Sequence, residues 1–157
     1  QQDAVKTSSY DWFVFRYAEI LLIYAEAKCE LGECTQAVLD ETINKLRDRV
    51  EMKHLTVSPV ADLNPVDYGY SITPLLYEIR RERRIEFAFE GKRYDDIRRW
   101  GIGNETNQGT IYGAWNPNEG SYVTIETRNC VFPKFDSWPL HQQEVTANPN
   151  IKQPTGW

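Results

Sequence analysis

The sequence predicts a mainly α-helical fold, in which antiparallel helical hairpins carry a long, loop-rich C-terminal region packed on them. Three observations predict this fold class. Apolar residues recur at helical spacing through the first hundred positions. The dipeptide Thr73-Pro74, a strong helix-start signal, precedes an amphipathic segment that runs to Trp100. Glycines and prolines then punctuate residues 101–157.

Length and composition limit the classes of protein to which this chain can belong. With 157 residues, of which 41% are hydrophobic, the chain can form one domain with a sizeable core. A net charge of −5 argues against a nucleic-acid partner, because binding nucleic acid requires a basic face. No apolar run approaches the roughly 18 residues of a membrane-spanning helix. The histidines and cysteines lack zinc-ligand spacing, so no metal is expected.

The first helix is expected to follow a short polar linker. Residues 1–12 are predicted to be this linker or N-terminal remnant, and residues 13–157 the domain, with a helical core over 12–100 and a loop-rich cap and tail over 101–157. The segment that begins at Phe13 is apolar most of the way round a helix, which is typical of a helix buried between others. This helix should end near Gly32. Cys29 and Cys34 flank this glycine and could form a disulfide, although half-buried thiols are the favoured interpretation.

A second helix is predicted from its N-cap residue, Thr35, to Val50. Its apolar residues form a single stripe through Leu39, Ile43 and Leu46. A very apolar helix, a glycine turn and an amphipathic helix make the antiparallel hairpin used in tetratricopeptide-like arrays. One such hairpin cannot bury its faces alone, so the fold needs more helices.

The charged segment 75–100 is predicted to supply those helices. A third helix should run from Pro74 to about Glu90, and a shorter fourth helix should end at Trp100. Beyond it, residues 122–125 could form a short strand. The remainder of the C-terminal region is expected to be loop packed against the helices.

The third helix places charged residues on a face that begins as apolar. Because a buried charge is costly unless it is paired, we expect these side chains to form ion pairs between helices. The predicted pairs join Arg83 or Arg84 to Glu19 or Glu26, and Glu86 or Glu90 to Arg93 or Arg99. Removing one member of a buried pair should cost about 3–5 kcal/mol, because the other member is left uncompensated.

Two other interpretations of this charged helix are open. In the first, the charges form a solvated zipper of pairs four residues apart, each worth only about 0.2–0.5 kcal/mol. In the second, Glu82 and Glu86 share one face and perform acid–base chemistry. The surrounding arginines should lower the pKa of these carboxyl groups, which works against a general acid. No catalytic residue is therefore expected.

Three groups of motifs in the chain resemble one known family. In the charged segment these are ERRIEF at 82–87, EGKR at 90–93 and DIRRW at 96–100. In the first hairpin they are RYAEILL at 16–22, AEA at 25–27 and NKLR at 44–47. The C-terminal group lies at 139–157 and reads PL, EV, NPNI, QP and GW in that order, with His141 and Thr155 as departures from the pattern. The chain resembles the SusD/RagB family, the surface glycan-binding lipoproteins of Bacteroidetes, over nearly its whole length.

The resemblance implies a function as well as a fold. It implies the C-terminal domain of a longer protein with a tetratricopeptide-like helical scaffold. The implied activity is non-catalytic capture of oligosaccharides or polysaccharides, and their delivery to a SusC-like, TonB-dependent outer-membrane transporter. The implied location is the outer membrane, as a cell-surface lipoprotein whose anchor lies in an N-terminal part outside this chain. No cofactor is implied, and the recognised motifs look like helix-packing residues.

Aromatic side chains on loops are the candidates for contact with sugar, because pyranose rings stack on flat aromatic faces. The candidates are Tyr68, Tyr70, Tyr112, Trp115 and Tyr122, with Asn116 as a neighbouring group for sugar hydroxyls. The alternative is that these rings cover the helices. Three tryptophans lie inside family-like motifs and are assigned to packing: Trp100, Trp138 and Trp157.

Three functions remain open at this point. The first is a glycan-binding module of the SusD type. The second is a helical interaction scaffold that docks the transporter, with the glycan site in a missing N-terminal part. The third and weakest is an enzyme such as a glycoside hydrolase.

Overall fold

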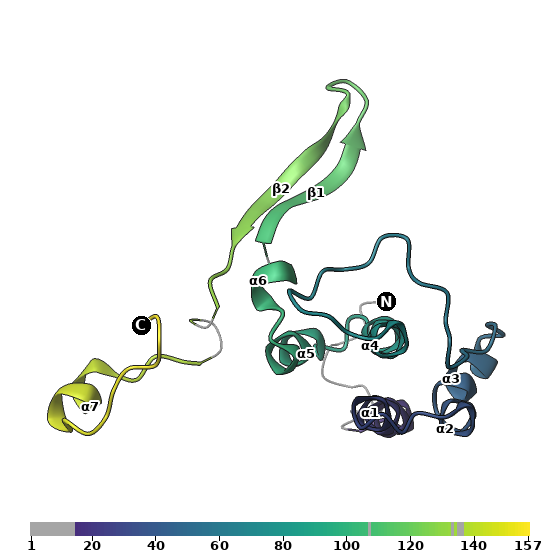
Figure 1. The fold of residues 1–157 in the computed structure, drawn as a ribbon. Coiled ribbons are helices and arrows are strands. Elements are labelled where there is room, and N and C mark those ends of the chain that lie inside the picture. The colour runs from purple at the N-terminus through teal and green to yellow at the C-terminus, as the bar shows by residue number, and fades with distance from the viewer. Residues whose placement is uncertain (1–14, 107, 133, 135–136) are drawn as a thin grey trace, which may run out of the picture. The chain divides into compact units, whose positions relative to one another are not determined.

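The computed structural model describes residues 15–106, 108–132, 134 and 137–157 (Figure 1). The expected linker over 1–12 and the expected helix start at Phe13 lie outside these residues. The described part of the chain is mainly helical, with one small sheet of two strands, and this confirms the predicted fold class. It divides into two compact units, one formed by residues 1–61 and 73–88 and the other by residues 62–72 and 89–157.

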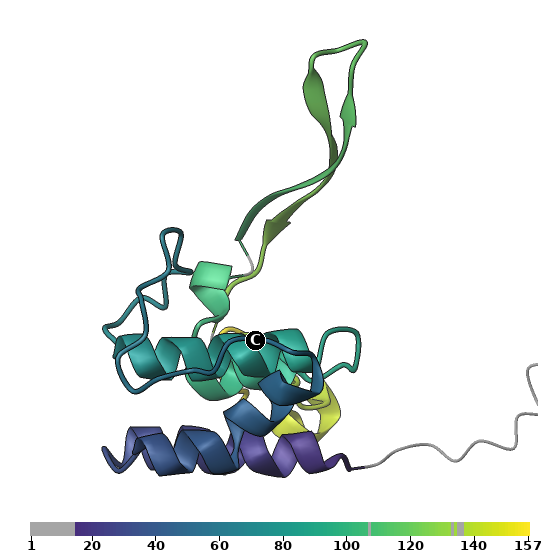
Figure 2. The same ribbon diagram turned by 90° about the vertical axis from the view of Figure 1, so that its right-hand side faces the viewer.

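The first unit is a group of four helices. Figure 2 shows two of them side by side, α1 (Tyr17–Glu30) and α4 (Pro74–Glu86). The two shorter helices that pack with α1 are α2 (Gln36–Glu41) and α3 (Ile43–Arg49). Arg16 contacts Glu86 at one end of the α1–α4 pair and Glu30 contacts Arg80 towards the other, so the two helices run antiparallel.

The ends of these helices follow the predicted signals. Thr35 and Thr73 each accept a hydrogen bond from the backbone N–H three residues later, as N-cap residues do. Pro74 occupies the first position of α4. Gly32 has a φ of 72° just beyond α1, which is the left-handed conformation of a helix-terminating glycine.

The core of the first unit lies between α1, α4 and the α2–α3 pair. It is built from small and branched apolar side chains of all four helices, with one residue from the following loop and one after α4: Ala18, Leu22, Ala25, Leu39, Ile43, Ile79, Leu55 and Phe87. Cys29 and Cys34 pack against this core as free, half-buried thiols. The structure therefore agrees with the thiol interpretation of these two residues.

Two helix boundaries differ from the sequence prediction. The helix expected over 35–50 breaks at Thr42, whose hydroxyl donates to the Val38 carbonyl oxygen at 2.6 Å and whose backbone leaves the helical region. A threonine that bonds back to the preceding turn often bends a helix. The third helix ends at Glu86 rather than near Glu90, because Phe87 leaves helical geometry and Phe89 has a positive φ of 65°.

Among its described residues, the second unit contains three helices, α5 (Arg93–Trp100), α6 (Gly103–Thr106) and α7 (Gln142–Ala147). Trp100 is buried, in agreement with its assignment to packing, and Gly101 ends α5 in the left-handed conformation. Trp157 donates from its indole nitrogen to the carbonyl oxygens of Lys134 and Ser137. The assignment of Trp138 to packing was wrong, because this side chain is 85% exposed.

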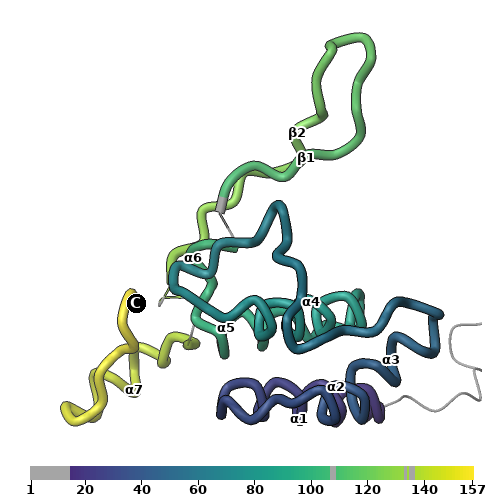
Figure 3. Tube along the Cα trace, turned by 45° about the vertical axis from the view of Figure 1, so that its right-hand side comes forward, coloured from purple at the N-terminus to yellow at the C-terminus, as the bar shows by residue number. Residues whose placement is uncertain are grey.

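The second unit also contains a β-hairpin, which is longer than the short strand predicted at 122–125. Its strands are β1 (Gln108–Asn116) and β2 (Ser121–Asn129), which pair antiparallel around a turn at 117–120. Figure 3 traces this hairpin from β1 to β2. Among the described residues, no helix is both long and apolar enough to cross a membrane.

Candidate functional site

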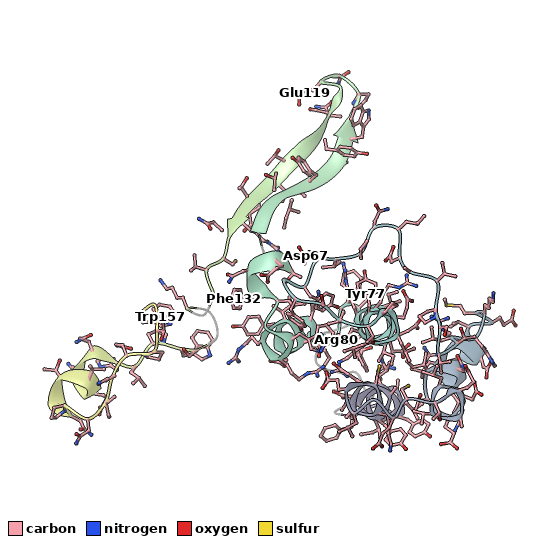
Figure 4. The ribbon with its side chains drawn as sticks, in the orientation of Figure 1. Asp67, Tyr77, Arg80, Glu119, Phe132 and Trp157 are labelled. Atoms are coloured by element: carbon pink, nitrogen blue, oxygen red, sulfur yellow. The ribbon has the colours of Figure 1, made fainter. Side chains whose placement is uncertain are left out.

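The turn of the β-hairpin is organised by Asn116. Its backbone carbonyl oxygen accepts from the N–H groups of Glu119 and Gly120, and its side-chain oxygen accepts from the Asn118 N–H at 3.1 Å. This is an asparagine turn, in which the side chain mimics a backbone acceptor. Gly120 has a φ of 62°, a conformation that glycine adopts without steric cost. Glu119 lies at the tip of the hairpin (Figure 4).

One face of the hairpin carries three aromatic rings, which we call the aromatic face. Trp115 and Tyr122 are direct cross-strand partners with ring centroids 5.1 Å apart, and Tyr112 lies 6.4 Å from Tyr122. All three are exposed, by 62% for Tyr112, 53% for Trp115 and 57% for Tyr122. The structure brings three of the five aromatic candidates together, with Asn116 next to Trp115.

Irregular pairing puts these rings on one face. In a regular strand, residues three apart such as Tyr112 and Trp115 would point to opposite faces. The register shifts on both sides of Tyr112, so that Tyr112 pairs with Thr124 and Trp115 with Tyr122. Bulges of this kind redirect side chains.

A second contact within the hairpin joins Ile125 of β2 to Gly113 of β1. Ile125 lies over Gly113, where a Cβ atom would come within 2.9 Å of the Ile125 Cδ1 atom. The absence of a side chain at Gly113 therefore lets Ile125 lie against the strand backbone.

The two remaining aromatic candidates belong to a different cluster, around Trp100. Tyr68 is only 7% exposed and its ring lies 6.1 Å from the Trp100 ring and 6.0 Å from the Tyr70 ring. Tyr70 donates from its hydroxyl to the Trp100 carbonyl oxygen at 2.8 Å. Tyr68 and Tyr70 thus hold the loop 62–72 against α5. The buried ring of Tyr68 has no open face for a sugar, which is a correction to its selection as a candidate.

The predicted ion-pair residues of the first unit lie between α1 and α4. Arg83 Nη2 is 3.8 Å from Glu19 Oε1, and both side chains are nearly buried. Glu26 receives a hydrogen bond from Arg80 at 3.2 Å, and Arg80 also donates to Glu30 at 3.0 Å. Figure 4 labels Arg80. Arg84, the alternative to Arg83 in the prediction, is exposed on α4.

Glu86 is bound by arginines other than those predicted. Arg16 donates to its Oε1 atom at 3.0 Å, and Arg49 donates to its Oε2 atom at 2.7 Å. Burial raises the pKa of Glu86, but the hydrogen bonds from Arg49 and Arg16 outweigh it, and the net pKa is lowered. Arg99 instead donates to Asp96 at 3.2 Å, and both Arg93 and Arg99 lie over the Trp100 ring. Glu90 is exposed after α4.

One charged and one polar residue of α3 that the sequence analysis did not place in the network complete it. Arg47 donates to Glu82, lies within 4.0 Å of Glu78 and also holds the Lys53 carbonyl oxygen at 2.8 Å. Asn44 both donates to and accepts from the backbone of Leu55. The signal was present in the sequence, since Asn44 and Arg47 lie one helical turn apart on the buried side of α3.

Arginines bind the two carboxylates that the sequence offers for acid–base chemistry. Glu82 and Glu86 are each bound by arginine, and the lowered pKa of Glu86 keeps that group ionised, which is unsuitable for a general acid. Among the described residues, no group of three or more histidine, cysteine, aspartate or glutamate side chains could hold a metal ion.

Comparison with known proteins identifies the family of the chain. A model of the SusD family matches residues 1–157. The chain belongs to the SusD family. This confirms the resemblance of its motifs, and it connects the SusD signature to the contacts above: ERRIEF supplies Glu82, Arg83 and Glu86, and NKLR supplies Asn44 and Arg47.

Curated SusD-like proteins and solved SusD-like structures are similar to the chain. SusD-like protein P2 of Formosa agariphila is 38% identical over 151 residues, which is 93% of this chain and 26% of that protein. SusD-like protein P38 of the same species is 30% identical, over 89% of this chain and 23% of that protein. The chain thus spans about a quarter of the length of these relatives.

Two crystal structures from Bacteroides fragilis have the same fold. One, a SusD-like carbohydrate-binding protein, is 35% identical with a TM-score of 0.65, over 88% of this chain and 28% of that one. The other, a SusD-like protein, is 33% identical with a TM-score of 0.71, over 93% of this chain and 26% of that one. The signature residues Asn44, Arg47, Glu82, Arg83 and Glu86 all belong to the first unit of this SusD-family chain.

Proposed function

We propose that the chain is the glycan-binding C-terminal part of a SusD-like protein at the bacterial cell surface. In this proposal the whole protein captures oligosaccharide and passes it to a SusC-like, TonB-dependent transporter without catalysing a reaction. The N-terminal part of the same protein carries the lipid anchor in the outer membrane. Membership of the SusD family and the likeness to a carbohydrate-binding protein of B. fragilis support this function.

The aromatic face of the β-hairpin is the observation that carries the proposal. A pyranose ring presents C–H groups on its flat face, and these pack favourably on an aromatic ring. Trp115 and Tyr122 are set edge to face at 74°, so their surfaces form a corner rather than one plane. Such a corner suits two successive sugar rings of a chain, one on each aromatic surface.

Asn116 supplies the polar group that such a site requires. The side-chain oxygen of Asn116 accepts a hydrogen bond from the Asn118 N–H. Among the described residues, no acceptor lies within hydrogen-bond distance of its NH₂ group. That NH₂ group can donate to a hydroxyl of a sugar stacked on the neighbouring Trp115. A few placed polar groups beside apolar surface are typical of small-molecule sites.

The proposal is tested by calorimetric titration of the complete gene product with oligosaccharides from plant and host polysaccharides. We expect Trp115→Ala to weaken binding about tenfold or more, the effect of losing a central aromatic contact. Trp138→Ala is the matched control, because Trp138 is an exposed tryptophan outside the hairpin, and it should leave the affinity unchanged.

The same titration separates the other functions. Equal affinities of wild type and Trp115→Ala would refute the hairpin site and favour a helical scaffold that docks the transporter, with the glycan site in the N-terminal part. Release of shortened sugars during the titration would indicate a glycoside hydrolase instead.

A further inference from the structure

The turn that follows α1 brings two cysteines together. Gly32 has a φ of 72° and its N–H donates to the Cys29 carbonyl oxygen at 3.1 Å, so the chain reverses between Cys29 and Cys34. The residues that precede the two cysteines, Lys28 and Glu33, are joined twice. The Glu33 N–H donates to the Lys28 carbonyl oxygen at 2.8 Å, and the Lys28 ammonium group donates to the Glu33 carboxylate at 2.6 Å. These bonds hold the backbones of the two cysteines in proximity.

The side chains of the two cysteines also meet. Both thiols are half-buried and pack against the apolar core of the first unit. The Cys34 thiol donates a hydrogen bond to the Cys29 sulfur, and the hydroxyl of Thr73 donates a second one to the same sulfur. A hydrogen bond between thiols places the two sulfur atoms side by side, which is the arrangement that a disulfide requires.

The two thiols differ in how readily they ionise. Burial raises the pKa of Cys29, and the hydrogen bonds from Thr73 and Cys34 partly offset this rise. Burial also raises the pKa of Cys34, and the neighbouring Cys29 raises it further, to about 11. Cys29 therefore forms a thiolate more readily than Cys34 does. Because the thiolate is the nucleophile in disulfide exchange, Cys29 is the attacking residue of the pair.

We propose that Cys29 and Cys34 are an oxidisable pair, which a disulfide reagent converts into a disulfide between the last turn of α1 and the residue before the N-cap of α2. The reagent is a small disulfide or a disulfide-bearing oxidoreductase, since both supply the same chemistry. The inference rests on the proposed function in one respect, because a cell-surface location puts the chain where disulfides persist.

The oxidation takes two exchange steps. The Cys29 thiol loses its proton to solvent, and its thiolate attacks one sulfur of the reagent, which forms a mixed disulfide and releases one thiolate. The Cys34 thiol then loses its proton and attacks the Cys29 sulfur, which forms the Cys29–Cys34 bond and releases the second thiolate. The two cysteines together lose two electrons, and the reagent is reduced to two thiols.

The bond strengthens a junction of three helices. It links the end of α1 to the start of α2, and the hydrogen-bond partner of Cys29 is Thr73, the N-cap residue of α4. The fold that holds the two thiols together favours the bond, and by linkage the bond stabilises that fold.

The test exposes the folded complete gene product at pH 8 to buffers that contain reduced and oxidised glutathione in graded ratios. Iodoacetamide in urea then traps the remaining thiols, and tryptic peptides are weighed by mass spectrometry. Trypsin cuts after Lys28 and Lys45, so both cysteines fall in one peptide, 29–45. The oxidised peptide carries no alkyl group and is lighter than the reduced, unalkylated peptide by two hydrogen atoms. Peptide 129–134 is the control, because its single cysteine, Cys130, cannot form an internal disulfide.

The glutathione ratio at half-oxidation decides the proposal. We expect this ratio for peptide 29–45 to be about tenfold more reducing in the folded protein than in the urea-unfolded protein, because the fold holds the two thiols together. An equal or more oxidising ratio in the folded protein would overturn the proposal, and so would alkylation of both cysteines at every ratio.

Two single variants test the order of the steps. Cys34→Ser keeps the attacking thiol and should retain one glutathione on Cys29, whereas Cys29→Ser should take up glutathione on Cys34 several times more slowly. Faster uptake by Cys29→Ser would refute the assignment of Cys29 as the attacking residue. The glycan titration of Trp115→Ala does not involve these thiols, so failure of the hairpin site and failure of the thiol pair are separate results.

Discussion

The buried arginine of α4 allows a quantitative test of how this scaffold is held together. Arg80 donates to Glu26 at 3.2 Å and to Glu30 at 3.0 Å, and the side chains of Arg80 and Glu26 are about 95% buried. Arg80→Met keeps the length of the side chain and removes its charge. Glu26 then remains in the core with less compensation for its lost hydration.

The expected cost is large for a single substitution. Leaving a buried charge uncompensated costs about 3–5 kcal/mol, which corresponds to a fall in melting temperature of about 6–20 °C for a chain of this size. Arg84→Met is the matched control on the same helix, because Arg84 is exposed, and it should change stability by no more than about 0.5 kcal/mol. Urea unfolding followed by circular dichroism measures both.

A double variant shows whether the cost belongs to the ion pair. Combining Arg80→Met with Glu26→Gln removes both charges, and we expect it to be less destabilising than the sum of the two single variants. Equal stabilities of Arg80→Met and Arg84→Met would refute the reasoning, because the buried charge would then need no compensation from Arg80.

Two further predictions follow from the pKa shifts. Because the pKa of Glu86 lies below its usual 4.5, Glu86 should stabilise the fold above pH 4.5 and progressively less as the pH falls through the lowered pKa. The free energy of unfolding of Glu86→Gln should therefore fall less steeply with acid than that of the wild type. Burial, and then the neighbouring Cys29, raises the pKa of Cys34 to about 11. Iodoacetamide should therefore modify Cys34 at pH 8 more slowly in folded than in urea-unfolded protein, and equal rates would contradict this. The contribution of the Cys34 thiol to the free energy of unfolding should persist below pH 9 and decline towards pH 11.

The helices of this protein could largely be predicted because their signals are local. Thr35, Thr73 and Gly32 act through hydrogen bonds and backbone angles within a few residues, so each is readable without tertiary context. The break at Thr42 was missed because a threonine within an apolar stripe can point either to solvent or back to the preceding turn.

The sequence predicted that buried charged residues would form ion pairs between helices, but it did not identify which residues pair. Helical spacing correctly indicated that charged residues of α4 face α1. It did not show that Arg80 meets Glu26, or that Arg16 and Arg49 both meet Glu86. Long side chains reach several positions, and the relative shift of two helices along their axes decides among them.

The glycan-site candidates show the same limit. Aromatic residues on polar segments were a sound starting set, but sequence alone could not separate a ring packed inside the fold from an exposed one. Tyr68 lies against Trp100, whereas Trp115 is exposed on the hairpin. The hairpin itself was missed except for part of β2, because its strands have mixed polarity on both faces and a two-stranded ribbon gives only a weak alternation signal.

The amino-acid sequence alone was sufficient for the helical class, the helix starts and the family, because these depend on local hydrogen bonding, apolar spacing and motifs that the chain carries in order. The tertiary structure decided which arginine binds which carboxylate and which rings share a surface. Tyr112 shares a face with the cross-strand pair of Trp115 and Tyr122 because the pairing of β1 with β2 shifts register at Tyr112. That shift depends on backbone hydrogen bonds between two strands, a property that neither strand has by itself.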